Sequence, residues 1–184
     1  MRYVWKACLE LIGWKTDLVF PYHHIAKYII LVGPHTSNWD FIIGLAYRNI
    51  LGMTQTRFLG KKELFKPPFG SIFRWLGGTP VDRQSNHNMV EEVARLFKDH
   101  DRFSLALSPE GTREKVEKLR TGFYFIAKEA GVPLIMAGLD YRNKQMIFSP
   151  PFYPTGSQAL DIEYVIGFFR GIEGKIPSNG LMHL

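Results

Sequence analysis

The chain has 184 residues, of which 46% are hydrophobic and 22% charged, and this composition predicts one folded domain and excludes a disordered protein. Its single cysteine, Cys8, excludes an intrachain disulfide framework and a cysteine-based zinc cluster, and it fits a reducing compartment. The formal net charge of +6 predicts an anionic partner, which leaves nucleic acid, acidic lipid headgroups and phosphorylated substrates open.

The first predicted element is an amphipathic helix at residues 3–14. Trp5 and Trp14 flank it and basic residues lie opposite its apolar stripe, which is typical of a helix in a membrane interface. Packing on its own domain is the alternative, because amphipathicity does not separate the two. No segment approaches the roughly 20 apolar residues of a membrane span, and charges interrupt the opening residues, unlike a signal peptide. The stripe consists of Val4, Ala7, Cys8, Leu11 and Ile12.

Strand-like and helix-like segments then alternate along the chain. Residues 28–32, YIILV, form a buried strand that ends at Gly33-Pro34, and the following helix has one apolar face from Trp39 to Ile50. This alternation predicts an α/β domain with a largely parallel central sheet flanked by helices. The other predicted strands are 56–60, 102–107, 132–139 and 145–149, and the other predicted helices are 69–76, 87–99, 121–130 and 158–170.

The turn between the first strand and its helix carries a histidine and an aspartate. Ser37 and Asp40 match a capping box, which explains Asp40 without any function. His35 has no capping role, and it lies at the carboxyl end of a predicted parallel strand, where α/β folds bind ligands. A carboxylate that accepts a hydrogen bond from one imidazole nitrogen makes the other more basic, so the pair can take a proton from a substrate hydroxyl. Both interpretations stay open on this spacing alone.

Three further turns follow predicted strands, or a helix that leads into one. SPEGTRE at 108–114 combines a glycine turn with Arg113, which suits a phosphate or a carboxylate. GGTPVDR at 77–83 ends in Arg83, and GKKELF at 60–65 places lysines after another strand. Each turn alone fits a solvated surface, but together they are expected to converge on one edge of one sheet.

Taken in order, these segments resemble the glycerolipid acyltransferases typified by 1-acylglycerol-3-phosphate acyltransferase. The resemblance covers about residues 28–140. The chain departs from the family at Pro34, where Asn is frequent, and at Ser108, where an aromatic residue is usual. The four blocks of the family, the first being H-x4-D, correspond to His35–Asp40, Gly78–Arg83, Pro109–Arg113 and Gly131–Ile135, with similar segments between them at Lys61–Phe65 and Arg120–Gly122.

The resemblance implies an O-acyltransferase of phospholipid biosynthesis. It would move a fatty acyl group from acyl-CoA or acyl carrier protein to the hydroxyl of a lysophospholipid. The expected acceptor is 1-acylglycerol-3-phosphate, which gives phosphatidate. His35 would act as general base and Asp40 would orient it, without a covalent acyl-enzyme, a metal or a cofactor beyond the acyl donor. The substrate-binding residues would be Lys61, Arg83, Glu110, Gly111, Thr112 and Arg113.

We expect a single acyltransferase domain over residues 1–184, with the motif-bearing core at 28–140 and the amphipathic helix at 1–15. The expected partners are the acyl donor and an anionic membrane, which residues 1–15 would contact peripherally from the cytoplasm at the inner face of the cell membrane. No nucleic-acid motif is present, so no nucleic-acid partner is expected. Cys8 is interpreted as a packing residue, and His23-His24 as a weak metal site.

Three alternatives remain. The acceptor could be another lysolipid or an amino-lipid, and the same histidine and aspartate could activate water to hydrolyse the thioester. A non-enzymatic basic module that binds membranes or nucleic acid would explain the charge, but it would leave His35 and the Glu-Gly-Thr-Arg turn without a role. Product analysis separates the first two from the proposed acyl transfer.

Overall fold

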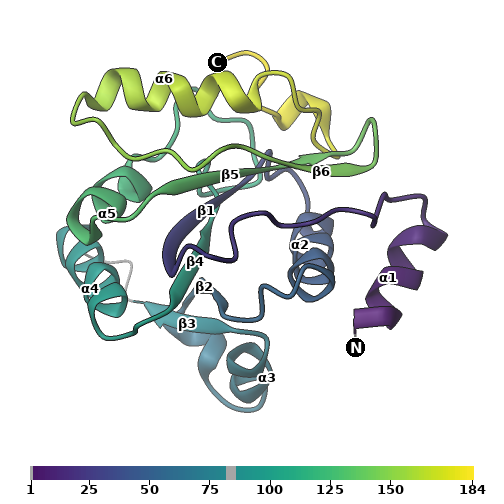
Figure 1. Cartoon of the computed structure of the whole chain (residues 1–184), viewed down its shortest axis with the longest axis horizontal. Helices are drawn as coiled ribbons and strands as arrows, with labels where there is room; N and C mark the ends of the chain where they lie inside the picture. The colour runs from purple at the N-terminus through teal and green to yellow at the C-terminus, as the bar shows by residue number, and fades with distance from the viewer. Residues whose placement is uncertain (1, 82–85) are drawn as a thin grey trace.

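The fold is an α/β domain built on one six-stranded sheet with the strand order β3-β2-β4-β1-β5-β6. Figure 1 shows the computed structural model, which describes residues 2–81 and 86–184. Strands β1 to β5 pair in parallel and β6 pairs antiparallel to β5, so the largely parallel sheet is confirmed. The strands are β1 (Lys27–Gly33), β2 (Thr56–Lys61), β3 (Gly78–Val81), β4 (Phe103–Leu107), β5 (Leu134–Asp140) and β6 (Gln145–Phe148).

Helices cover both faces of the sheet (Figure 1), and on each face one apolar cluster lies between the helices and the strands. Successive side chains of a strand point to opposite faces, and in β1 Ile29 joins the cluster under α4, α5 and α6, whereas Ile30 joins the cluster under α1 and α2. The helices are α1 (Arg2–Leu11), α2 (Asn38–Ile50), α3 (Gly70–Trp75), α4 (Asn86–Lys98), α5 (Gly122–Ala130) and α6 (Gln158–Phe169), with short 3-10 helices η1 (Lys62–Phe65) and η2 (Pro177–Asn179).

The order of the strands creates a switch point beside β1. From β1 the chain moves outward to β2 and β3, returns to β4 next to β1, and then continues to β5 on the other side of β1. Loops after strands on the two sides of such a point leave a crevice at the carboxyl ends of the strands. The loops after β1 and β4 carry the predicted H-x4-D and Glu-Gly-Thr-Arg segments, so the fold brings these two together.

Strand β3 was not predicted, since its residues were interpreted as a turn. The strand is short, begins with Gly78 and contains Pro80, which lacks a backbone donor. It lies at the edge of the sheet and pairs with β2 alone, and an edge strand tolerates proline. The local sequence therefore gives little signal for this strand, because its pairing with β2 stabilises it.

Helix α1 is present, but it ends at Leu11 and not at residue 14 as predicted. Trp14, for which an interface and the core were both open, follows the helix; it is 4% exposed and packs edge-on against the rings of Tyr47 and Tyr141, so it belongs to the core. Cys8 is exposed, so its interpretation as a packing residue is wrong. The helix is held through Leu9, whereas most of its predicted apolar stripe faces outward, with Val4 65% and Leu11 88% exposed.

Among the described residues, no helix combines the length and the apolar character that crossing a bilayer requires.

Candidate active site

The histidine and the aspartate of the β1–α2 turn form a pair. Nδ1 of His35 lies 3.3 Å from Oδ2 of Asp40, and the side chains are 21% and 0% exposed. The capping box is also present, because the Ser37 amide donates to the same Oδ2 at 2.7 Å and the Ser37 hydroxyl accepts from Trp39 N. The cap and the pair therefore coexist: the hydrogen bonds that start α2 also aim the carboxylate at the imidazole.

Two further donors fix the carboxylate of Asp40. The Thr36 amide donates to Oδ2 at 2.7 Å, and the Tyr141 hydroxyl donates to Oδ1 at 2.5 Å. Burial alone would raise the pKa of Asp40, but the hydrogen bonds from His35, Tyr141 and Ser37 outweigh it and hold the pKa below its ordinary value. Asp40 is thus a buried anion directed at the imidazole.

Tyr141 was missed by sequence reasoning. It directly follows β5, which is the neighbour of β1, so its ring reaches Asp40 only once the strand order is known. Burial and the bond to the Asp40 carboxylate raise the pKa of the Tyr141 phenol, which keeps it a donor. The available signal was its place at the carboxyl end of a predicted strand, and that place is not specific.

Glu110 faces the interior of the protein. It is 1% exposed; Oε1 accepts from the His35 amide at 2.6 Å, and Oε2 accepts from the Ser108 hydroxyl at 2.9 Å. Burial raises the pKa of Glu110, and the bonds from His35 and Ser108 only partly offset it. Glu110 was predicted to bind substrate, but these contacts tie the loop after β4 to the histidine backbone. Ser108, the departure from the family pattern, takes part in this tie.

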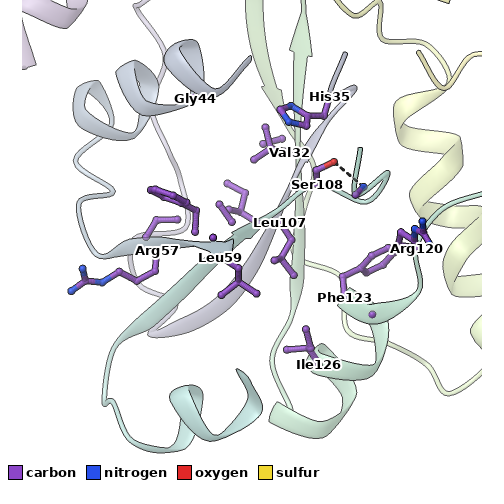
Figure 2. Close-up of a pocket in the computed structure, with 18 of the residues that line it drawn as sticks. Val32, His35, Gly44, Arg57, Leu59, Leu107, Ser108, Arg120, Phe123 and Ile126 are labelled. Atoms are coloured by element: carbon purple, nitrogen blue, oxygen red, sulfur yellow. Dashed lines mark hydrogen bonds between the residues drawn. The ribbon is translucent and has the colours of Figure 1, made fainter. Parts of the chain in front are cut away.

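The rest of the Glu-Gly-Thr-Arg turn borders a cavity with His35. Gly111, Thr112 and Arg113 all line it. Gly111 has φ +68°, a conformation that favours glycine, and a Cβ there would lie 3.0 Å from Cγ of Arg120. The Gly111 amide donates to the Ser108 hydroxyl at 3.3 Å, and Figure 2 shows Ser108 below His35. Three predicted residues therefore meet the histidine at one site.

The two other predicted cations are not placed by the structure. Arg83 lies outside the described residues. Lys61 is the last residue of β2, and its side chain is not described. In the part of the chain that the structure describes, no three His, Cys, Asp or Glu side chains come together as a group that could hold a metal ion.

The cavity has a volume of about 1850 Å³ and opens where two strands diverge. Strands β2 and β4 pair only as far as Phe58 and Ala106, although β4 continues along β1 and β2 continues along β3. Side chains from both faces of the sheet line the resulting space, and Figure 2 shows it extending from His35 along Leu107 and Leu59. Its apolar wall includes Val32, Phe58, Leu59, Leu107, Phe123 and Ile126.

Cationic side chains also line the cavity. Arg120 lies beside the Glu-Gly-Thr-Arg turn, and Arg57 comes from β2, as Figure 2 shows. Neither was predicted as a site residue, although Arg120 belongs to a segment that resembles the family. A cavity with an apolar wall and an excess of positive charge suits an amphiphilic anion. The lining cations are Arg48, Arg57, Arg95, Lys98, Arg113, Arg120 and Lys128.

Comparison with known proteins gives one family and one structure. The sequence profile of the family described as "Acyltransferase" matches residues 21–139. The crystal structure of the 1-acyl-sn-glycerophosphate (LPA) acyltransferase PlsC from Thermotoga maritima is similar, with a TM-score of 0.59 and 17% sequence identity over 95% of this chain and 80% of that chain. No curated protein sequence matches the chain. At this identity the structural likeness shows a shared fold.

Proposed function

Because the chain belongs to the acyltransferase family, we propose that it moves a fatty acyl group from acyl-CoA or acyl carrier protein to the hydroxyl of a lysophospholipid. The acceptor in this proposal is 1-acylglycerol-3-phosphate and the product is phosphatidate. The observation that carries the proposal is the His35–Asp40 pair at a cavity with an apolar wall and cationic side chains. The apolar wall suits an acyl chain, and the cations suit a phosphate.

In the proposed reaction His35 is the general base. Its Nδ1 is turned toward Asp40, so Nε2 takes the proton of the acceptor hydroxyl. The hydroxyl oxygen then bonds to the thioester carbonyl carbon, the carbon–sulfur bond breaks, and the departing sulfur receives the proton from the imidazole. General-base catalysis of this kind is worth typically about 10²–10⁴ in rate. No metal and no cofactor beyond the acyl donor enters the proposal.

Three side chains position the base. Asp40 fixes the tautomer and stabilises the imidazolium that forms during proton transfer. Tyr141 holds the second carboxylate oxygen of Asp40, and Glu110 holds the backbone amide of His35. We therefore assign Glu110 to positioning and not to substrate binding, because both of its oxygens have protein partners.

Arginines near the base bind the acceptor phosphate in this proposal. Arg113 lines the cavity and follows Glu110 in the same loop. Its backbone carbonyl accepts a hydrogen bond from the side-chain amide of Asn179 at 3.0 Å, which fixes the loop. Arg120 covers Gly111 from the next segment. Planar guanidinium groups bind phosphate oxygens in pairs. Arg83 and Lys61 remain candidates from the sequence, and Gly111 and Thr112 shape the turn.

We also propose peripheral attachment to an anionic membrane from the cytoplasmic side, because the acceptor is a lipid. The exposed stripe of α1 supports this, since Val4 and Leu11 face away from the core. An interfacial helix buries such a stripe at the level of the headgroups. The partners in the proposal are membrane lipids and the acyl donor, with no nucleic acid.

One experiment tests the proposal. Purified protein is incubated with acyl-CoA or acyl carrier protein donors and a panel of lysolipids and amino-lipids, and the products are identified by mass spectrometry. Phosphatidate formed by the wild type and lost in His35→Ala supports the proposal. Free fatty acid as the main product would identify a thioesterase, and acylation of a different acceptor with lysophosphatidate untouched would replace the acceptor assignment.

A further inference from the structure

A second apolar surface lies far along the chain from α1, on η1 and α3. Figure 1 shows α3 beside β3, at the opposite edge of the sheet from α6. Four large apolar side chains of this segment face solvent, and none of them belongs to the buried clusters of the core. We call this set the η1–α3 patch, and its members and exposed fractions are Leu64 (45%), Phe69 (63%), Ile72 (51%) and Trp75 (70%).

The segment beneath the patch is firmly held. Phe65 is 4% exposed, and a Cβ at Gly60 or at Gly78 would come within 2.8 Å of its ring, so both strands leave room for it. Arg74 Nη1 donates to the Phe65 carbonyl at 3.1 Å, and its guanidinium lies 5.6 Å from the centre of the same ring. The apolar side chains of the patch are therefore presented by an anchored scaffold.

The charge around the patch selects its partner. Lys62, Lys66 and Arg74 are exposed within the same segment, and Glu63 is its one acidic residue in the sequence. Tryptophan and phenylalanine beside basic residues match the boundary between anionic headgroups and acyl chains. Each such basic residue near an anionic surface adds attraction, which falls off within a Debye length. The composition thus fits an anionic bilayer.

The patch also adjoins the candidate active site. Leu64 belongs to the patch and lines the cavity, and Phe73 of α3 lines it as well. A lipid that left a bilayer under the patch would meet apolar side chains up to the cavity, so its chain would not cross open water. A position at the cavity border is what an entrance from the membrane requires.

We propose that the η1–α3 patch docks on an anionic bilayer and admits the lipid substrate to the cavity. Its role in admission rests on the proposed function, whereas its role in docking does not. The exposed stripe of α1 would be a separate contact, and stable attachment to a membrane commonly needs two weak signals acting together. Phe69 and Trp75 are the side chains that enter the interface.

Vesicle binding tests the docking. The Phe69→Ser/Trp75→Ser double variant is compared with wild type by co-sedimentation with equimolar phosphatidylcholine and phosphatidylglycerol vesicles. Since each side chain removes apolar area from water, we expect binding to fall by about tenfold or more. Tyr153→Ser/Leu160→Ser is the matched control, because these residues are 61% and 70% exposed near and on α6, and it should bind as wild type does.

A charge variant guards against a folding defect in the double variant. Lys66→Glu alters one exposed residue, and we expect weaker binding to the anionic vesicles with unchanged binding to pure phosphatidylcholine vesicles. Patch variants that fold, by circular dichroism and thermal melting, and bind both vesicle types as wild type does would overturn the proposal. So would a loss in the α6 control equal to the loss in the patch variant.

Activity separates docking from the proposed function. With a short-chain lysolipid that is monomeric in solution, Phe69→Ser/Trp75→Ser should keep wild-type turnover, while turnover of an acceptor embedded in vesicles should fall with binding. A wild type that acylates neither acceptor would refute the proposed function and leave the vesicle result standing. Unchanged vesicle binding with turnover lost only for acyl carrier protein donors would overturn the proposal, because the patch would then bind the carrier.

Discussion

The hydroxyl of Tyr141 donates a 2.5 Å hydrogen bond to Oδ1 of Asp40, the aspartate whose other oxygen faces His35. The ring of Tyr141 packs edge-on against the ring of Trp14, with 5.0 Å between the ring centres. The backbone amide of Tyr141 donates to the carbonyl of Glu173 at 2.9 Å. The residue therefore connects the candidate catalytic pair to segments near both ends of the chain. The activity of a Tyr141 variant therefore measures how much the His35–Asp40 pair depends on the hydrogen bond from Tyr141.

We predict that Tyr141→Phe lowers kcat by about tenfold and leaves KM nearly unchanged. The variant keeps the packing against Trp14 but removes one charge-assisted hydrogen bond, worth about 1.5–3 kcal/mol in general. Asp40 then holds the imidazole less firmly, so proton transfer to His35 should slow. Steady-state kinetics over a pH series provides the check, and a variant with wild-type kcat at every pH would remove Tyr141 from the mechanism.

We predict that Asp40→Asn keeps its fold and loses activity nearly as completely as His35→Ala. The amide oxygen can still accept from Thr36 and Ser37, so the start of α2 is preserved, but the imidazole loses its charged partner. Turnover per folded molecule and unfolding by urea are measured together. If the variant were unstable yet fully active per folded molecule, Asp40 would serve the helix cap alone.

Site residues that lie close together in the sequence could be predicted, whereas contacts between residues far apart in the sequence could not. His35, Ser37 and Asp40 lie within one turn, so their spacing predicted the cap and left the catalytic pair open, and the resemblance to the family then favoured the pair. Tyr141 reaches Asp40 across 101 positions, and no local pattern marks such a contact. The inward direction of Glu110 was hidden for the same reason, because its partner is the amide of His35 in another loop.

The same limit applies to the fold. The central strands and most helices were predicted because apolar runs and caps are local signals, and their alternation gave the parallel sheet. Strand β3 was missed because pairing with β2, and not its own composition, makes it a strand. Helix α1 was predicted, but its periodicity could not tell that Leu9 and Trp14 would pack while Leu11 stayed outside.

Glu110→Gln should change the pH dependence of stability. Burial raises the folded-state pKa of Glu110 above its unfolded value, so the folded state binds the proton more tightly. Stability therefore falls as pH rises from the unfolded pKa through the folded pKa. Gln can accept from the His35 amide and donate to Ser108 without titrating.

We expect Glu110→Gln to lose this pH dependence, to be at least as stable as wild type at neutral pH, and to keep most of its turnover. Urea unfolding at a series of pH values and steady-state kinetics measure the two effects. Full activity loss in a stable Glu110→Gln, with Glu110→Asp active, would show that the charge itself is needed and that Glu110 does more than position His35.

We predict that Val4→Ser/Leu11→Ser weakens binding to anionic vesicles and leaves thermal stability unchanged, because both side chains are exposed in α1. Substitution is a better test than removal of residues 1–15, since removal would take away Leu9 and Trp14 from the core. Co-sedimentation measures binding. Wild-type binding by this variant would assign attachment to a surface other than α1.

The acceptor assignment rests on the arginines near His35. A phosphate monoester carries close to two negative charges near neutral pH, and a guanidinium fork binds its oxygens better than a lysine ammonium does. We predict that Arg113→Lys lowers kcat/KM for lysophosphatidate by about tenfold, which corresponds to about 1.4 kcal/mol. Turnover of lysophosphatidylcholine should fall less, because its phosphate is a diester with one negative charge.

Side-by-side kinetics with the two acceptors measures this difference. Arg142→Lys is the matched control, because Arg142 is exposed and is not among the described residues that line the cavity, so it should behave as wild type does. Since Arg113 borders the cavity and not the core, the variant should melt at the wild-type temperature. Equal loss on both acceptors would mean that Arg113 serves the acyl donor or the loop, and the phosphate would then have to be bound by other cations such as Arg120.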